Sequence, residues 1–240
     1  MEKCKGENMK YISGVLGVGL VVLFYCGTVQ AASVSISEDF GNIKYVDSIS
    51  TFTTTGNTMN GMEVVVDLGN TQETVYWNAG GNNTGALGTG WSLTMSDFDA
   101  STYFSGYWKF ETSGDVSVQS ITLNGFDHNV VFDNDIENKE TPGSEWGNPL
   151  MVFNSISQYG GSIDVTYTGL VGLNDGNDPF GDIYRSMTIG FVGGLFTSEN
   201  SLAYFQDTDN LHNPVPEPST MLLFGFGLVG LAGISRARKR

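Results

Sequence analysis

The body of the chain alternates apolar and polar residues with a period of two, and this pattern limits the folds available to it. In residues 62–68 every second residue is apolar, and in residues 162–168 the apolar positions are Ile163, Val165 and Tyr167. Successive side chains of a β-strand point to opposite faces of a sheet. Both segments are therefore predicted to be strands with one buried face.

Ten further segments are rich in Thr, Val, Ile and aromatic residues, which suit a half-buried pleated surface. They are residues 33–37, 45–54, 74–77, 91–95, 107–112, 117–124, 130–132, 150–153, 186–192 and 203–206. Clusters of Gly, Asn, Asp and Ser separate them and are typical of turns. The body shows neither a helical apolar period nor a repeat of fixed length. We therefore predict an all-β fold, a single antiparallel β-sandwich that is jelly-roll-like.

The N-terminus has the pattern of a secretory signal. Three lysines lie within the first ten residues, an uncharged run of apolar and small residues spans 11–25, and small residues precede the bond between Ala31 and Ala32. This order is typical of a signal peptide that signal peptidase removes. Residues 1–31 are therefore left out of the fold, and the mature protein is expected to begin at Ala32.

The C-terminus combines a proline-rich entry, a short apolar run and a basic tail. The apolar run from Thr220 to Ser235 is 16 residues long, which as a helix would extend about 24 Å and fall short of a ~30 Å hydrocarbon core. Basic residues tend to stay on the cytoplasmic side of a membrane. The tail is therefore expected to lie inside the cell, with a short transmembrane helix and the body outside. The residues that define this pattern are Pro216, Glu217, Pro218, Arg236, Arg238, Lys239 and Arg240.

These features, in this order and next to the chain end, resemble the PEP-CTERM sorting signal. The resemblance covers residues 214–240 and implies recognition by an exosortase, a membrane-embedded protease or transpeptidase that removes the tail. Proteins of this kind resemble surface or matrix proteins of Gram-negative bacteria that make exopolysaccharide. The resemblance therefore implies a protein that is first anchored in the inner membrane with its body in the periplasm. It then reaches the cell surface or the extracellular matrix.

Residues 32–213 remain as one extracellular domain with a strongly acidic composition. Both cysteines, Cys4 and Cys26, lie in the signal, so the domain holds no disulfide. Of the 11 basic residues, three lie in the signal and four in the tail, which leaves four in this domain. Of the 26 acidic residues, two lie in the signal and one in the tail, which leaves 23. The domain therefore has a formal charge of −19. A charge of this sign repels nucleic acid and anionic lipid and favours divalent cations.

No arrangement of residues in the sequence indicates catalysis. His128 and His212 are the only histidines, and neither lies in a motif that would supply a positioned base. A nucleophile elbow, a zinc-protease motif and a phosphate-binding loop are all missing from the sequence. The protein is therefore expected not to be an enzyme.

Acidic loops favour Ca²⁺ as the one expected cofactor, because Ca²⁺ takes six to eight oxygen ligands in flexible geometry. Three short stretches, 133–137, 175–182 and 207–210, concentrate carboxylates among Gly and Asn. None of them matches an EF-hand loop. The candidate ligands are Asp133, Asp135, Asp175, Asp178, Asp207 and Asp209.

Four tryptophans, Trp77, Trp91, Trp108 and Trp146, lie among Tyr and Asn residues. They are predicted to belong to the core, although sugar-binding sandwiches use the same residue types to stack on pyranose rings. The sequence thus predicts a structural or adhesive protein associated with exopolysaccharide or a biofilm matrix. Two alternatives stay open: a carbohydrate-binding module with an exposed Trp in a groove, and a polysaccharide hydrolase with paired carboxylates.

Overall fold

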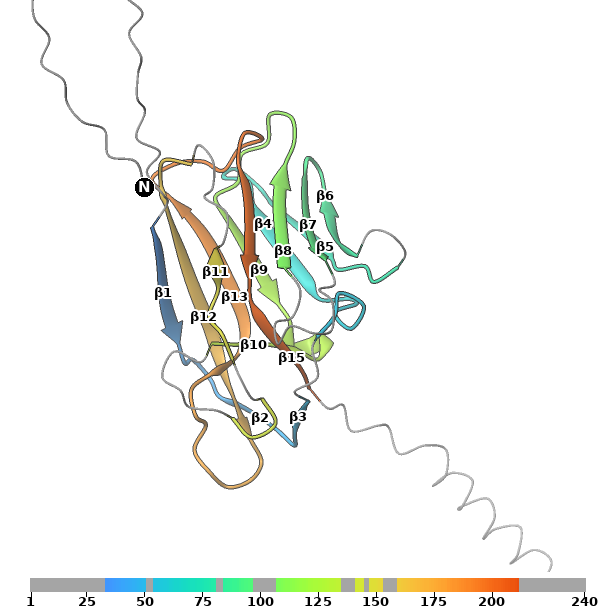
Figure 1. Cartoon of the computed structure of the whole chain (residues 1–240), viewed down its shortest axis with the longest axis vertical. Helices are drawn as coiled ribbons and strands as arrows, with labels where there is room; N and C mark the ends of the chain where they lie inside the picture. The colour runs from blue at the N-terminus through green and yellow to red at the C-terminus, as the bar shows by residue number, and fades with distance from the viewer. Residues whose placement is uncertain are drawn as a thin grey trace, which may run out of the picture.

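Two β-sheets stack face to face in the protein (Figure 1). The computed structural model describes residues 33–50, 54–80, 84–96, 107–134, 141–144, 147–152 and 159–211. The predicted signal peptide, the predicted cleavage site between Ala31 and Ala32, and the predicted sorting tag all lie outside these ranges. Every described strand lies between Val34 and Leu211, so the body alone holds both sheets.

The larger sheet has ten strands. Seven of them follow one another in the order β3 (Ile49–Ser50), β15 (Asp207–Leu211), β10 (Val130–Asp133), β13 (Ile183–Val192), β9 (Ser120–Asn124), β4 (Glu63–Asp67) and β5 (Gln72–Tyr76). The long strand β12 (Ser162–Leu173) pairs antiparallel with β13. Two short strands, β1 (Val34–Asp39) and β2 (Lys44–Val46), pair parallel with β12.

The smaller sheet has five antiparallel strands, in the order β11 (Met151–Val152), β14 (Ser201–Phe205), β8 (Tyr107–Thr112), β7 (Trp91–Ser96) and β6 (Gly85–Gly88). The helical element of the described residues is one 3-10 turn, η1 (Phe126–His128). Within the described ranges no helix is long and apolar enough to cross a membrane.

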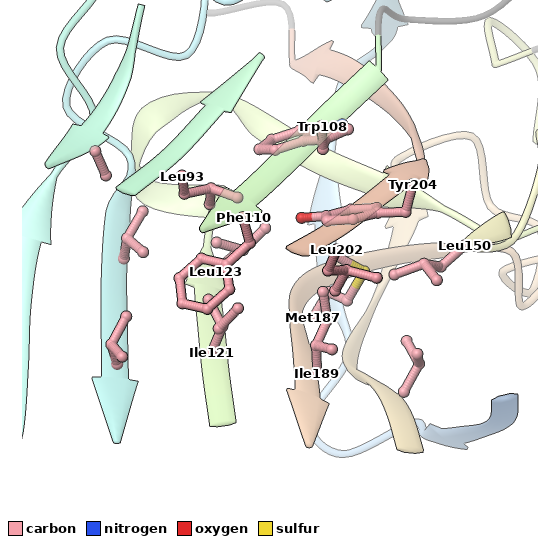
Figure 2. Close-up of a cluster of buried hydrophobic side chains, with 14 of the residues drawn as sticks. Leu93, Trp108, Phe110, Ile121, Leu123, Leu150, Met187, Ile189, Leu202 and Tyr204 are labelled. Carbon is pink, nitrogen blue, oxygen red and sulfur yellow. The ribbon is translucent and has the colours of Figure 1, made fainter. Parts of the chain in front are cut away.

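The core lies between the two sheets, where apolar side chains from both interdigitate (Figure 2). The indole of Trp108 on β8 stacks on the ring of Tyr204 on β14, with centroids 5.9 Å apart and planes 9° from parallel. Trp77 meets Trp108 edge to face at 5.2 Å. Aromatic rings bury large apolar areas and prefer such offset and edge contacts. A domain without a disulfide is thus held by an aromatic-rich core.

The all-β sandwich predicted from the sequence is confirmed, and most predicted strands appear within a few residues of their expected bounds. Two features differ from the prediction. The sheet includes parallel pairings at β12, in addition to the predicted antiparallel ones. Residues 207–210, interpreted as an acidic loop, instead form strand β15 between β10 and β3, because Thr208 is buried opposite Phe132 in the sheet.

Candidate functional site

Five side chains from five neighbouring strands form one row across the large sheet. The strand register places Tyr76 opposite Glu63, Glu63 opposite Asn124, Asn124 opposite Ser186, and Ser186 opposite Thr168. Strands in a sheet lie about 4.8 Å apart, so the row is about 19 Å long. We call these five residues the transverse row.

The transverse row lies on the face of the large sheet that points away from the small sheet. Along their strands, Val64 follows Glu63, Met187 follows Ser186 and Leu123 precedes Asn124. All three of these apolar neighbours are fully buried in the shared core. Because neighbouring side chains of a strand point to opposite faces, the polar residues of the row point to solvent. Tyr76 is 59% exposed, the highest value among the large apolar and aromatic side chains that the structure describes.

The η1 turn adds a wall to the transverse row and turns it into an open groove of about 480 Å³. The whole row lines this groove together with Phe126, Asp127, His128 and Arg185. The His128 ring meets the Tyr76 ring edge to face at 6.5 Å. A volume of this size falls in the range of ligand-binding clefts.

Two carboxylates line the groove. Asn124 Nδ2 donates to Glu63 Oε2 at 2.6 Å, which fixes the orientation of a half-buried carboxylate and leaves Glu63 Oε1 without a hydrogen bond among the described residues. Asp127 is exposed in η1 and takes part in no hydrogen bond or ion pair with the described part of the chain. Both carboxylates thus have acceptor capacity for a ligand.

Arg185, the only arginine of residues 32–213, also lines the groove. Its Nε donates to the carbonyl of Gly169 at 3.3 Å and its Nη2 to the carbonyl of Asn42 at 3.0 Å. Its guanidinium carbon lies 6.0 Å from the centre of the Phe126 ring. The side chain of Arg185 is therefore anchored on the backbone and on an aromatic face, rather than in a described ion pair.

The structure brings three of the predicted metal ligands together at another place. Asp133 at the end of β10 lies directly opposite Asp207 on β15, and Asp209 follows two residues along the same strand. Ser144 Oγ contacts Asp133 Oδ2 at 2.6 Å and also makes a short contact with Asp209. A hydroxyl has one hydrogen, so it donates to one of these two acids, and the second contact needs a proton on the other.

Burial of these carboxyls changes their acidity. Asp133 is 1% exposed, and its burial raises its pKa to about 9, a shift that Ser144 opposes and that Asp207 and Asp209 reinforce. Burial also raises the pKa of Asp209 to about 7, with Asp207 reinforcing the shift. Burial and the neighbouring like charges favour the protonated forms of both groups.

The remaining predicted ligands do not join Asp133, Asp207 and Asp209. Asp175 and Asp178 lie in an exposed turn between β12 and β13, where Asp175 accepts hydrogen bonds from Asn177. Asp135 lies outside the described residues. Among the residues that the structure describes, no three His, Cys, Asp or Glu side chains are placed to hold one metal ion. Ca²⁺ therefore stays a prediction.

The tryptophans belong to the core, as predicted, wherever the structure describes them. Trp77, Trp91 and Trp108 are at most 3% exposed, whereas Trp146 and His212 lie outside the described residues. The most exposed aromatic ring of the groove is instead that of Tyr76, which the sequence did not single out. The sequence places the residues of the transverse row in segments that are predicted to be strands. Only the pairing register of these strands shows that the five residues lie side by side.

The described body is thus a β-sandwich with an open polar groove on one face, and its chain continues into the C-terminal tag. Residues 214–239 match the family model of the PEP-CTERM protein-sorting motif. This match includes every predicted sorting residue except Arg240 and confirms the resemblance drawn from the sequence. The chain is therefore an exported protein with a membrane-anchoring tag that an exosortase processes. Comparison with curated proteins gave no match, and neither did comparison with solved structures.

Proposed function

We propose that the body is a non-catalytic surface or matrix module that binds polysaccharide through the groove over the transverse row. The observation that carries this proposal is the exposed Tyr76 ring at the end of a row of polar side chains. Sugar rings combine apolar faces with hydroxyl edges, so they suit an aromatic ring beside hydrogen-bonding groups. At about 19 Å, the row also has room for several consecutive sugar units.

The geometry favours binding over hydrolysis. A glycosidase needs one carboxyl kept as the acid, which proteins achieve by burying it. In this groove Asp127 is exposed and Glu63 is half-buried with a hydrogen bond from Asn124. Incubation with matrix polysaccharide is expected to release no reducing sugar, and release that depends on Glu63 would support the hydrolase alternative instead.

The direct test of binding compares two tyrosines of similar exposure. Tyr76 in the groove is 59% exposed and Tyr45 on β2, outside the groove, is 49% exposed. Tyr76→Ala should weaken binding to a polysaccharide panel by about tenfold, since stacking contributes on the order of 1 kcal/mol or more. Tyr45→Ala should leave binding unchanged. Equal affinities for both variants and the wild type would contradict the proposal.

The route to the surface is part of the same proposal. The body ends in β15 at Leu211, and the matched sorting motif begins three residues later at position 214. Signal peptidase would release the N-terminus at Ala32, and the exosortase would act on the tag once the body is outside. Changing Pro216 and Glu217 to Ala should leave a larger, membrane-retained form in the native host. Detection of Arg240 by mass spectrometry on wild-type protein in the matrix would contradict this route.

A further inference from the structure

The charges of the groove and of the whole body indicate which kind of polysaccharide fits. The groove holds Glu63 and Asp127 as acids and Arg185 as its only arginine. Two hydrogen bonds to backbone carbonyls and the Phe126 ring hold the Arg185 guanidinium in place. Two carboxylates against one guanidinium give the groove more negative than positive charge. Each carboxylate also has an oxygen without a described hydrogen bond, which a ligand can use.

The field of the body acts in the same direction. Residues 32–213 carry four basic and 23 acidic residues, a formal charge of −19. A field of this sign attracts cationic partners and repels anionic ones over distances of about a Debye length, ~8–10 Å at physiological salt. An acidic polysaccharide would be repelled before it reached the groove, whereas a polysaccharide with ammonium groups would be drawn to it.

We propose that the groove over the transverse row binds an amino-sugar polysaccharide, with an ammonium group of the sugar placed between Glu63 and Asp127 and a ring against Tyr76. This inference rests on the proposed polysaccharide binding and names its ligand class. An ammonium has three donors and no acceptor, so it matches two carboxylates that offer free acceptor oxygens. The exposed face of Tyr76 adds an attraction for a cation near the ring. The hydroxyls of Ser186 and Thr168, at the other end of the row, can pair with sugar hydroxyls.

The test uses the full chain in mild detergent and three hexasaccharides of equal length: glucosamine, N-acetylglucosamine and a uronic acid. N-acetylation removes the ammonium charge and keeps the ring, so the first two probes differ at the group that the carboxylates would bind. Calorimetric titration should give an affinity for the glucosamine hexamer about tenfold higher than for the acetylated one, and little binding of the uronate. Added NaCl should weaken the first interaction.

A matched pair of variants separates the groove from general attraction to an acidic surface. Glu63→Gln with Asp127→Asn removes two charges in the groove, and Asp175→Asn with Asp178→Asn removes two from an exposed turn outside it. The groove variant should lose about tenfold in affinity for the glucosamine hexamer and the control less than twofold. Asp127→Asn alone, at an exposed position, should lose part of the affinity without any effect on folding.

The outcomes separate this inference from the proposed function. Equal binding of the acetylated and free hexamers, with loss in Tyr76→Ala, would leave polysaccharide binding in place and overturn the amino-sugar assignment. The same loss in groove and control variants would also overturn it, as would binding of the uronate hexamer that depends on Arg185. Binding of none of the three hexamers, together with no binding across the polysaccharide panel, would overturn both proposals.

Discussion

Asn124 Nδ2 donates a 2.6 Å hydrogen bond to Glu63 Oε2 across the β9–β4 pair, and this contact sets the position of a carboxylate in the groove. Asn124→Ala should therefore weaken oligosaccharide binding about fivefold, the equivalent of one hydrogen bond of ~1 kcal/mol. Titration calorimetry measures this change.

Thr122→Ala is the control for Asn124→Ala. Thr122 lies two residues along the same strand, on the same face, and its hydroxyl pairs with that of Thr188 at 2.9 Å outside the groove. Thr122→Ala removes one hydrogen bond, so it should lose ~1 kcal/mol of unfolding free energy. Its affinity for the oligosaccharide should equal that of the wild type. If Thr122→Ala lost as much affinity as Asn124→Ala, the effect would come from the sheet rather than from the contact with Glu63.

Trp108 tests the account of the core. Its ring is fully buried, and its Nε1 has no hydrogen-bond partner among the described residues. Trp108→Ala should lower the free energy of unfolding by about 3–5 kcal/mol through the cavity that it leaves. Trp108→Phe should cost less than about 1.5 kcal/mol, because it keeps a ring and removes an unpaired donor. Urea denaturation measures both, and an equal loss in the two variants would contradict the expected gain from keeping a ring and removing an unpaired donor.

Glu73 on β5 is expected to make stability depend on acid pH. Burial by itself raises the pKa of Glu73. Its carboxylate, however, accepts hydrogen bonds from Trp91 Nε1 at 2.7 Å and from the backbone N–H and hydroxyl of Thr89. These hydrogen bonds outweigh the effect of burial and hold the pKa of Glu73 below its usual 4.5. A carboxyl with a lowered folded pKa stabilises the fold above its unfolded pKa, and this contribution disappears as the pH falls through the folded pKa.

Glu73→Gln should therefore be less stable than the wild type above about pH 5, and the difference should shrink as the pH falls through the lowered folded pKa of Glu73. Denaturant titrations at several pH values give this comparison. Trp91→Phe removes one of the donors and should lose part of the same pH-dependent difference. A gap between Glu73→Gln and wild type that is constant from pH 3 to 7 would contradict the hydrogen-bond account.

Ca²⁺ binding, predicted from the acidic stretches, can be tested where the structure brings the buried Asp133 and Asp209 together. Extracellular sites bind Ca²⁺ at ~0.1–1 mM, so 1 mM Ca²⁺ should stabilise the protein by roughly 0.4–1.4 kcal/mol and raise its Tm by a few degrees. Asp133→Asn with Asp209→Asn should abolish this rise, whereas Asp175→Asn with Asp178→Asn should keep it.

NaCl at matched ionic strength and Mg²⁺ are the controls for the melting experiment, because simple screening also stabilises an acidic protein. Equal shifts from all three salts would mean screening without a site. The alternative is that Asp133 and Asp209 only share a proton and bind no metal. In that case the double variant Asp133→Asn, Asp209→Asn should have a higher Tm than the wild type in EDTA. Ca²⁺ should then change the Tm of neither protein. That outcome would contradict the Ca²⁺ prediction.

The alternation in residues 62–68 and 162–168 was enough to predict strands β4 and β12 and the sandwich, because burial of one face leaves a period of two in the sequence. Strand β15 was missed because Asp and Asn are rare in strands, and only pairing with β10 and β3 explains their presence there.

The groove was not predictable for a related reason. Asn124 follows Glu63 by 61 positions and Ser186 follows Asn124 by 62, so these residues meet only through the strand register. Each looks like an ordinary outward-facing polar residue in its own segment. Tyr76 likewise lies between Val75 and Trp77 in an apolar run and gives no sign by itself that its ring is exposed.

The most direct test of the central claim is to map backbone amide shifts of residues 32–213 by NMR during titration with the polysaccharide fragment that binds best. The account predicts that the largest shifts fall on the transverse row, at Tyr76, Glu63, Asn124, Ser186 and Thr168, and on the η1 turn beside it. Shifts concentrated elsewhere, such as the hollow between Leu68 and Gln119, or no shifts with any fragment, would contradict it.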